Sequence, residues 1–189
     1  MRKLILVKHA RPQVAEGISS RNWHLSDEGR AACGPLADVL RAHDPGIIIT
    51  SDEPKAFETG QLLGEALGKP VGTAEGLHEH DRSNVPMMPS REFLSMLALF
   101  FRERDRLVLG RETATEAATR FQNAIDRIVS THDSGNIVVV THGTVLALFA
   151  ADHEAGDAFT FYRKLGLPSL MTFSIPEYRL EEIVERVPA

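Results

Sequence analysis

Short apolar runs alternate along this chain with longer stretches in which apolar residues recur every three or four positions. The runs are too short for helices and rich in β-branched residues, so the three clearest are predicted as buried strands: 4–7, 46–50 and 137–140. Three weaker strands are predicted by the same reasoning at 71–74, 170–175 and 180–184. The chain therefore offers six strands separated by helical segments.

Helix start signals follow the first two strands. Ser26 can cap a helix whose first turn is acidic, and Pro35 inside that helix predicts a kink or a late start. After the second strand, Ser51 or Asp52 can cap another helix with Pro54 in its first turn. Both segments carry an apolar face, which predicts that they pack against a sheet.

The stretch 89–131 breaks the alternation of strands and helices. An amphipathic pattern at 93–101 predicts one helix, and Thr113 with Glu116 forms a capping box for the next. We interpret 89–131 as a helical lid or specificity insertion within a single domain, 1–189. A last helix is predicted from about 144 to 153, after the strand at 137–140. This order of elements predicts an α/β fold whose sheet is covered by helices on both faces.

Composition and charge narrow the class of protein. Hydrophobic residues make up 43% of the 189 residues and charged residues 25%, the balance of a soluble globular domain with a full core. The formal net charge of -5 argues against general nucleic-acid binding, so an anion site must be a local positive pocket. The single cysteine, Cys33, cannot form an intramolecular disulfide, and no segment approaches the ~20 apolar residues that cross a bilayer. We expect a cytoplasmic protein with no nucleic-acid or membrane partner.

A histidine follows two of the predicted buried strands, two residues beyond the end of each. His9 follows the first strand with Lys8 before it and Arg11 after it, and His142 follows a second such strand with Gly143 behind it. Open α/β sheets bind ligands at the carboxyl ends of their strands, so we expect one site built from both histidines. Cations beside imidazoles favour an anionic substrate, of which phosphate is the commonest. A neutral imidazole can attack phosphorus near neutral pH.

Two further segments suit a phosphate site. Lys55 lies in the first turn of a predicted helix, where a cation opposes the helix dipole unless it faces a bound anion. Glu79, in the polar cluster 78–82, can act as a general acid if partial burial raises its pKa. Each of these residues would be a solvated surface group if it stood alone.

The same polar cluster admits a metal-binding alternative. His78 and His80 with Asp81 could hold a metal on a loop, although no second pair of ligands stands out. The sequence contains no Gly-rich phosphate-binding loop and no dinucleotide fingerprint, so ATP and dinucleotide cofactors have no support. We predict no metal and no cofactor.

Five motifs in order resemble the histidine phosphatase superfamily, the phosphoglycerate-mutase-like group. The strand that ends in Lys8-His9-Ala10 is similar to the family's strand followed by Arg-His-Gly or Arg-His-Ala. Leu25–Gly29 resembles a family helix start, and Ser51–Thr59 resembles the motif Ser-x-x-x-Arg-Ala-x-x-Thr. Leu77–Glu79 resembles the Leu-x-Glu that carries the acid, and Val140–Gly143 resembles the second-histidine motif. The motifs span most of the chain.

The resemblance implies a three-layer α/β/α sandwich with a mostly parallel sheet and no cofactor. It implies His9 as nucleophile, Glu79 as proton donor, and a phosphate pocket that contains Lys8, Lys55 and His142. The chain is shorter than the resemblance would require for a full glycolytic mutase.

The chain departs from the family pattern at both pocket arginines, which are lysines here: Lys8 and Lys55. Lysine keeps the charge but loses the planar fork with which arginine grips phosphate. Arg11, Arg21 or Arg82 is a candidate to supply that fork instead.

We predict a phosphomonoester hydrolase that acts on a small phosphorylated metabolite through a phosphohistidine. The predicted catalytic residues are His9, Glu79 and His142, and the predicted phosphate-binding residues are Lys8, Lys55, Arg11, Gly143 and Arg82. One alternative, motivated by the two lysines, is a phosphate-ligand binding protein of the same fold with weakened turnover. Another is a metal-dependent hydrolase that uses the cluster 78–81, which full activity in a chelator would exclude.

Overall fold

The computed structural model describes residues 2–187, which contain a six-stranded sheet in the order β3-β2-β4-β1-β5-β6. The strands are β1 (Arg2–Lys8), β2 (Pro45–Thr50), β3 (Val71–Thr73), β4 (Asn136–Thr141), β5 (Ser169–Ile175) and β6 (Leu180–Val184). The first four run parallel to one another, and β5 and β6 add an antiparallel edge. The six predicted strands and the mostly parallel sheet are confirmed.

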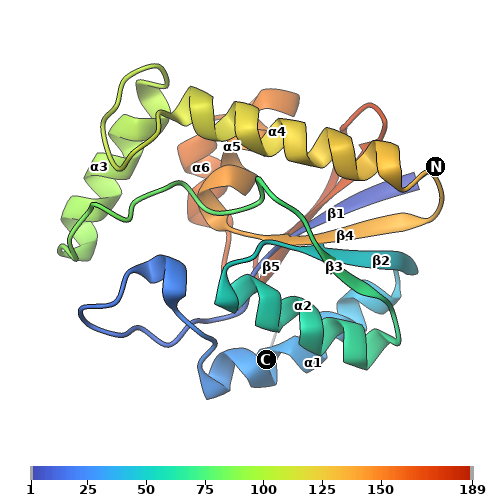
Figure 1. Cartoon of the computed structure of the whole chain (residues 1–189). Helices are drawn as coiled ribbons and strands as arrows, with labels where there is room; N and C mark the ends of the chain where they lie inside the picture. Colours follow the sequence, from blue (N-terminus) through green and yellow to red (C-terminus); the bar gives the residue numbers. More distant parts are fainter. Residues whose placement is uncertain (1, 188–189) are drawn as a thin grey trace.

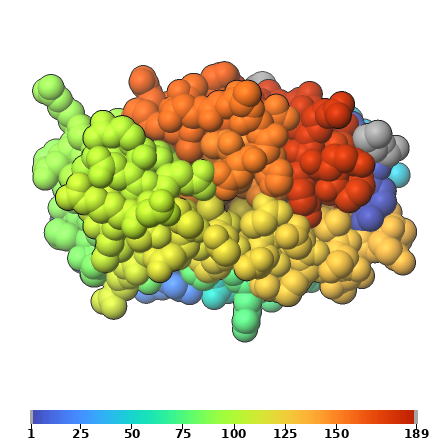
Figure 2. All heavy atoms as spheres, turned by 90° about the horizontal axis from the view of Figure 1, so that it is seen from above, coloured from blue at the N-terminus to red at the C-terminus, as the bar shows by residue number. Residues whose placement is uncertain are grey.

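Helices cover both faces of the sheet, as Figure 1 shows. α1 (Asp27–Arg41) and α2 (Pro54–Leu67) lie on one face, below the sheet in that view. α4 (Ala114–Thr131), α5 (Gly143–His153) and α6 (Ala158–Lys164) lie on the other. From above, in Figure 2, the side chains of α4 and of the α5–α6 pair form a continuous layer over that face. The fold is the expected three-layer α/β/α sandwich.

Successive residues of β1 face opposite layers, which explains why its whole apolar run is buried. Leu4 and Leu6 belong to the core that includes Phe121 of α4, whereas Ile5 and Val7 belong to the core against α1 and α2. Side chains alternate along a strand, and helices on both faces of a parallel sheet bury both sets. The position of β1 at the centre of the sheet follows from this double burial.

α1 begins as the sequence predicts but does not break at its proline. Ser26 is the N-cap, and its hydroxyl accepts the N–H of Gly29 at 3.1 Å. The helix runs through Pro35 without a late start, because Leu36 and Leu40 on its buried face pack into the sheet core. Pro35 still removes one backbone hydrogen bond from the helix.

The predicted N-cap of α2 is wrong. The N-cap residue is Glu53, which makes no side-chain capping bond, and Pro54 is the first helical residue. Ser51 lies within 2.9 Å of the His142 ring instead, and the Glu53 carboxylate binds Lys55. The first turn of α2 therefore has no side-chain cap, because the side chains of Ser51 and Glu53 bind residues of the strand-end cluster described below.

α3 (Ser90–Arg102) stands beyond the carboxyl ends of the parallel strands, whereas α4 packs on a face of the sheet (Figure 1). The buried side chains of α3 contact the start of α4 and the α5–α6 pair: Leu97, Phe100 and Phe101. The capping box is confirmed, because Thr113 accepts the N–H of Glu116 at 3.1 Å and returns its own N–H to the Glu116 carboxylate at 2.7 Å. A lid role for 89–131 stays a prediction.

The sequence analysis missed α6, which has only seven residues and follows α5 after a short turn. Asp157 caps it by accepting the N–H of Thr160 at 2.8 Å. Within residues 2–187, we find no helix with the length and apolarity needed to cross a bilayer.

Candidate active site

The two strand-end histidines lie side by side. β1 and β4 are adjacent and parallel, and the N–H of His9 extends their pairing by donating to the Thr141 carbonyl at 3.0 Å. The ring centroids of His9 and His142 are 5.2 Å apart. His142 is fully buried and His9 is 7% exposed, so both lie at the base of the site rather than on the surface.

The His9 ring is neutral and has a defined tautomer. Burial, followed by the nearby His142 and Lys55, lowers the pKa of His9 well below its ordinary value. Its Nδ1 lies 2.7 Å from the carbonyl oxygen of Ala10. A carbonyl oxygen can only accept, so Nδ1 carries the proton and the lone pair resides on Nε2. The tautomer leaves Nε2 as a nucleophilic nitrogen.

His142 is held by a hydroxyl and faces a carboxylate. Its Nε2 lies 2.9 Å from the Ser51 hydroxyl, and its Nδ1 lies 3.7 Å from the carboxylate of Glu53. Burial, with Lys55 as the next contribution, lowers the pKa of His142 well below its ordinary value. The ring is therefore neutral in this structure, and its contact with Glu53 is not an ion pair.

Lys8 is half-buried beside the first residue of α5. Its ammonium donates to the Leu165 carbonyl at 2.8 Å and lies 5.4 Å from the centre of the Tyr162 ring. Burial lowers the pKa of Lys8 to about 8, with Glu79 opposing this effect and Arg82 adding to it. A Cβ on Gly143 would lie 3.0 Å from the Lys8 side chain, so any larger residue at 143 would require the lysine to shift.

Lys55 forms a buried ion pair with Glu53, a residue that the sequence analysis missed. The Lys55 ammonium also donates to the Ser20 carbonyl at 2.8 Å. The other oxygen of Glu53 accepts the N–H of Glu79 at 2.9 Å. Glu53 is 3% exposed and thus joins α2 to the 78–82 loop. Its place two residues before Lys55 in the Ser51–Thr59 motif was the available signal.

Glu79 faces the start of α5 and is ionised. Its carboxylate accepts the N–H of Thr144 at 3.1 Å and that of His80 at 2.8 Å. Burial opposes ionisation, but the Arg82 guanidinium and these two backbone donors together outweigh it and hold the pKa well below the usual carboxyl range. Burial raises the pKa of Glu79 as expected, but the net shift is downward, so the condition set for an acid role is not met by burial alone.

Of the two arginines predicted at the phosphate, only Arg82 reaches this cluster. Its guanidinium lies 3.7 Å from the Glu79 carboxylate and donates to the Thr144 hydroxyl at 3.2 Å. Arg11 instead pairs with Glu28 at 3.3 Å, at the exposed start of α1. We therefore leave Arg11 out of the phosphate site.

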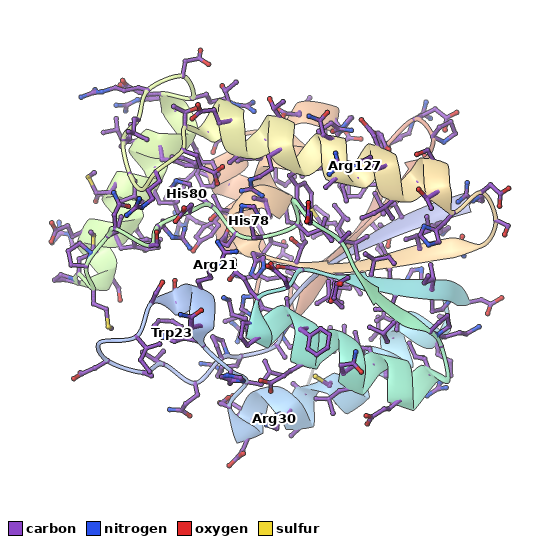
Figure 3. The ribbon with its side chains drawn as sticks, in the orientation of Figure 1. Arg21, Trp23, Arg30, His78, His80 and Arg127 are labelled. Carbon is purple, nitrogen blue, oxygen red and sulfur yellow. The ribbon has the colours of Figure 1, made fainter. Side chains whose placement is uncertain are left out.

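The histidines of the 78–82 loop have different surroundings from those expected of metal ligands. In Figure 3, His78 and His80 lie across from Arg21 of the N-terminal loop. His80 stacks on Phe100 with ring centroids 4.2 Å apart, and its Nε2 is 3.2 Å from the Glu112 carbonyl. Over the described part of the chain, no group of three or more His, Cys, Asp or Glu side chains is arranged to hold a metal ion.

Two neutral histidines, two lysines and a carboxylate gather where the parallel strands of a three-layer sandwich end. A fold and cluster of this kind define the class of histidine-dependent phosphoryl-transfer proteins. The family model described as the histidine phosphatase superfamily (branch 1) matches residues 4–185. The chain belongs to that superfamily.

A curated relative matches part of the chain. Glucosyl-3-phosphoglycerate phosphatase of Mycolicibacterium vanbaalenii is 30% identical over 82 residues, which are 42% of this chain and 36% of that protein. The chain thus matches little more than a third of that relative's length.

Solved structures match nearly the whole chain at low identity. A mycobacterial glucosyl-3-phosphoglycerate phosphatase with inorganic phosphate has a TM-score of 0.75 at 22% identity, with 96% of each chain covered. A mutant phosphoserine phosphatase of Entamoeba histolytica in complex with phosphoserine has a TM-score of 0.76 at 19% identity, with 97% of each chain covered. The α-ribazole phosphatase of Shigella flexneri has a TM-score of 0.72 at 17% identity, covering 97% of this chain and 96% of that one. These likenesses show the fold.

Proposed function

We propose that this chain is a phosphomonoester hydrolase that acts on a small phosphorylated molecule through a phosphohistidine. The observation that carries the proposal is the His9 ring, whose Nδ1 donates to the Ala10 carbonyl and whose Nε2 is left as a lone-pair nitrogen. A neutral nucleophile beside lysine cations suits attack on a phosphate ester. The likeness to solved phosphatases supports the same reading.

The reaction would proceed in two displacements. Nε2 of His9 attacks phosphorus, the P–O ester bond breaks, and the leaving oxygen takes a proton from Glu79. Water then attacks the phosphohistidine, the P–N bond breaks, and the water's proton passes to the Glu79 carboxylate. Inorganic phosphate leaves, and both side chains return to their starting states.

The surrounding charges fit this sequence. Lys8, Lys55 and His142 surround the position of the phosphoryl group and stabilise its equatorial oxygens. A bound phosphate dianion places negative charge beside Glu79, and a like charge raises the pKa of a carboxyl group. Substrate binding is therefore expected to shift Glu79 toward the protonated form that the acid role requires.

Glu79→Gln is expected to slow alkyl phosphates by about 10²–10⁴-fold, the usual range for a lost general acid. Aryl phosphates with good leaving groups should lose far less, since they depart without protonation. The measurement is kcat/KM for a series of phosphate esters of graded leaving-group acidity. Glu75→Gln, an exposed residue on the same connection, is the matched control. Equal losses on alkyl and aryl esters would place Glu79 in binding or structure and move the acid elsewhere.

Lys8→Arg is expected to change kcat/KM modestly at neutral pH and to extend it to higher pH. The pKa of Lys8 is lowered to about 8, so the wild-type site loses a positive charge as pH rises through that value. Arginine stays protonated over the whole range, so its phosphate contact persists. The check is the pH profile of kcat/KM, which reports on the free enzyme. Lys69→Arg, two residues beyond the end of α2, should leave the profile unchanged. If Lys8→Arg loses activity at high pH in the same way as wild type, Lys8 is not the origin of that loss.

A second candidate function is a phosphate-ligand binding protein with little turnover. It is favoured by two contacts: Lys55 is already paired with Glu53, and Lys8 already donates to a carbonyl. Trapping of a phosphoenzyme from labelled substrate, in the presence of a chelator, separates the candidates. Hydrolysis with a trapped intermediate supports the phosphatase, tight phosphate binding without either supports the binder, and loss of activity in the chelator supports a metal-dependent hydrolase.

A further inference from the structure

A large pocket lies beside the candidate active site and is not used by the mechanism above. It has a volume of about 910 Å3 and is formed between the N-terminal loop at 16–23 and the segment at 82–93. Its apolar walls come from both segments: Ile18, Trp23, Val85, Met87, Met88 and Phe93. In Figure 3, Trp23 lies on the N-terminal loop, across from the loop that carries His78 and His80.

Arg82 joins this pocket to the catalytic cluster. It lines the large pocket and also a small cavity of about 10 Å3 that contains Glu53 and Glu79. On the catalytic side its guanidinium contacts Glu79 and the Thr144 hydroxyl, and on the other side it lies 5.2 Å from the centre of the Phe93 ring. A ligand whose phosphate reaches Arg82 therefore has its remaining atoms at the mouth of the apolar pocket.

The chemistry of the walls selects against a highly polar occupant. Of the side chains that line the pocket, only Glu16 and Arg82 carry a charge, and the remaining polar ones are serines. Ile18 and Met87 are 49% and 62% exposed, so apolar surface is open to water at the mouth. Exposed apolar patches of this kind mark binding sites, and methionine side chains adapt to ligands of irregular shape.

We propose that the pocket binds the alcohol part of the substrate, and that this part is a bulky apolar group. The proposal rests on the proposed function, since it takes the phosphate to sit at His9. The substrate class is a phosphate monoester of a hydrophobic alcohol, in contrast to esters of small, charged or polyhydroxylated alcohols. A pocket of this volume falls within the range that holds ligands of drug-like size, on the order of 300–1,000 Å3.

The test compares n-propyl phosphate with 3-phenylpropyl phosphate, whose leaving alcohols have nearly the same acidity and differ in apolar bulk. Each fully buried methylene improves affinity by about fourfold, so the added phenyl group should raise kcat/KM by about tenfold or more. Leaving-group chemistry cannot produce this difference. Binding of the matched non-hydrolysable phosphonates, measured by calorimetry, should show the same preference.

Variants locate the preference in the pocket. Met88→Ser and Trp23→Ala should each lower the ratio of kcat/KM for the phenylpropyl ester to that for the propyl ester by about threefold or more, as expected for lost apolar contact. Met88 lies on a surface loop, so its replacement keeps the test valid if Trp23→Ala fails to fold. Phe57→Ala, an exposed aromatic residue on α2 outside the pocket, is the matched control and should leave the ratio unchanged.

The outcomes separate this inference from the proposed function. Hydrolysis of both esters with equal kcat/KM, or a preference that survives both pocket variants, overturns the apolar pocket and leaves the phosphatase intact. If neither ester is hydrolysed and no phosphoenzyme forms, the proposed function fails. The phosphonate affinities then test by themselves whether the pocket binds an apolar group, because equal affinities for the propyl and phenylpropyl compounds would contradict that proposal.

Discussion

Replacing His9 with alanine is expected to abolish phosphomonoester turnover together with the acid-labile, base-stable phosphoenzyme. The ring is the nucleophile of the proposed mechanism, because Nδ1 is held on the Ala10 carbonyl and the lone pair resides on Nε2. Loss of a covalent nucleophile typically costs on the order of 10⁴-fold or more in kcat. The measurements are steady-state hydrolysis and phosphoenzyme trapping by acid-free gel electrophoresis.

The unfolding free energy of His9→Ala must be measured, both to show that the variant is folded and because its pH dependence should differ from that of wild type. The pKa of His9 is lowered by burial, so the folded state resists the protonation that the unfolded chain accepts below the ordinary value of 6.5. The unfolded state then binds more protons than the native state, and stability falls as pH drops through and below 6.5. His9→Ala removes one such group, so its unfolding free energy should decline less steeply over that acidic range.

His132→Ala is the matched control for the nucleophile. His132 follows α4 near the start of β4, at the opposite end of the strands from His9. The control should keep both turnover and the phosphoenzyme. A folded His9→Ala protein with wild-type activity would exclude the phosphohistidine mechanism, and trapping of a phosphoenzyme in that variant would place the nucleophile elsewhere.

The sheet could be predicted because its signals are local. The runs in β1 and β4 are apolar throughout, and only a strand with helices on both faces buries such a run completely. The capping box of α4 is equally local, since Thr113 and Glu116 interact within one turn. α6 escaped prediction because its few apolar residues fit a loop as well as a helix.

The site could be predicted only where strand order determines it. His9 and His142 end neighbouring parallel strands, so their meeting follows from the fold. Arg11 was misassigned because its partner Glu28 lies on a separate element. Glu53 was missed because its contacts with the Glu79 N–H and with His142 join distant parts of the chain. The ionised state of Glu79 also depends on Arg82 and on backbone donors whose orientation no sequence motif records.

The buried pair of Lys55 and Glu53 gives the second large expected effect. Lys55→Met removes the cation that pairs with the Glu53 carboxylate. The Glu53 side chain is only 3% exposed, so its charge stays buried without a partner cation. Breaking a buried ion pair by removing one partner costs about 3–5 kcal/mol of stability. Activity should fall as well, because a cation that stabilises the transferring phosphoryl group is lost. The measurements are the free energy of unfolding in denaturant and kcat/KM on phosphomonoesters.

A double variant separates the structural loss from the catalytic one. Glu53→Gln combined with Lys55→Met removes both charges, so most of the lost stability should return while kcat/KM stays low. Lys55→Arg keeps the charge and should change turnover only modestly. Lys69→Met, which breaks an exposed contact of 3.6 Å with Asp44, should cost at most about 1 kcal/mol and leave activity unchanged.

Variants of Lys8 and Lys55 also test whether the positive charge at this site is needed for catalysis or only for the stability of the fold. If the site is catalytic, Lys8→Met together with Lys55→Met should lower kcat/KM far more than either arginine replacement, even when Glu53→Gln restores stability. If the chain is a phosphate binder, wild type should bind phosphate or vanadate with negligible turnover, and the double arginine variant is the one that gains activity. Equal activity in wild type and in the double methionine variant would mean that neither lysine contacts the phosphoryl group, and the assignment of both positions by family resemblance would be wrong.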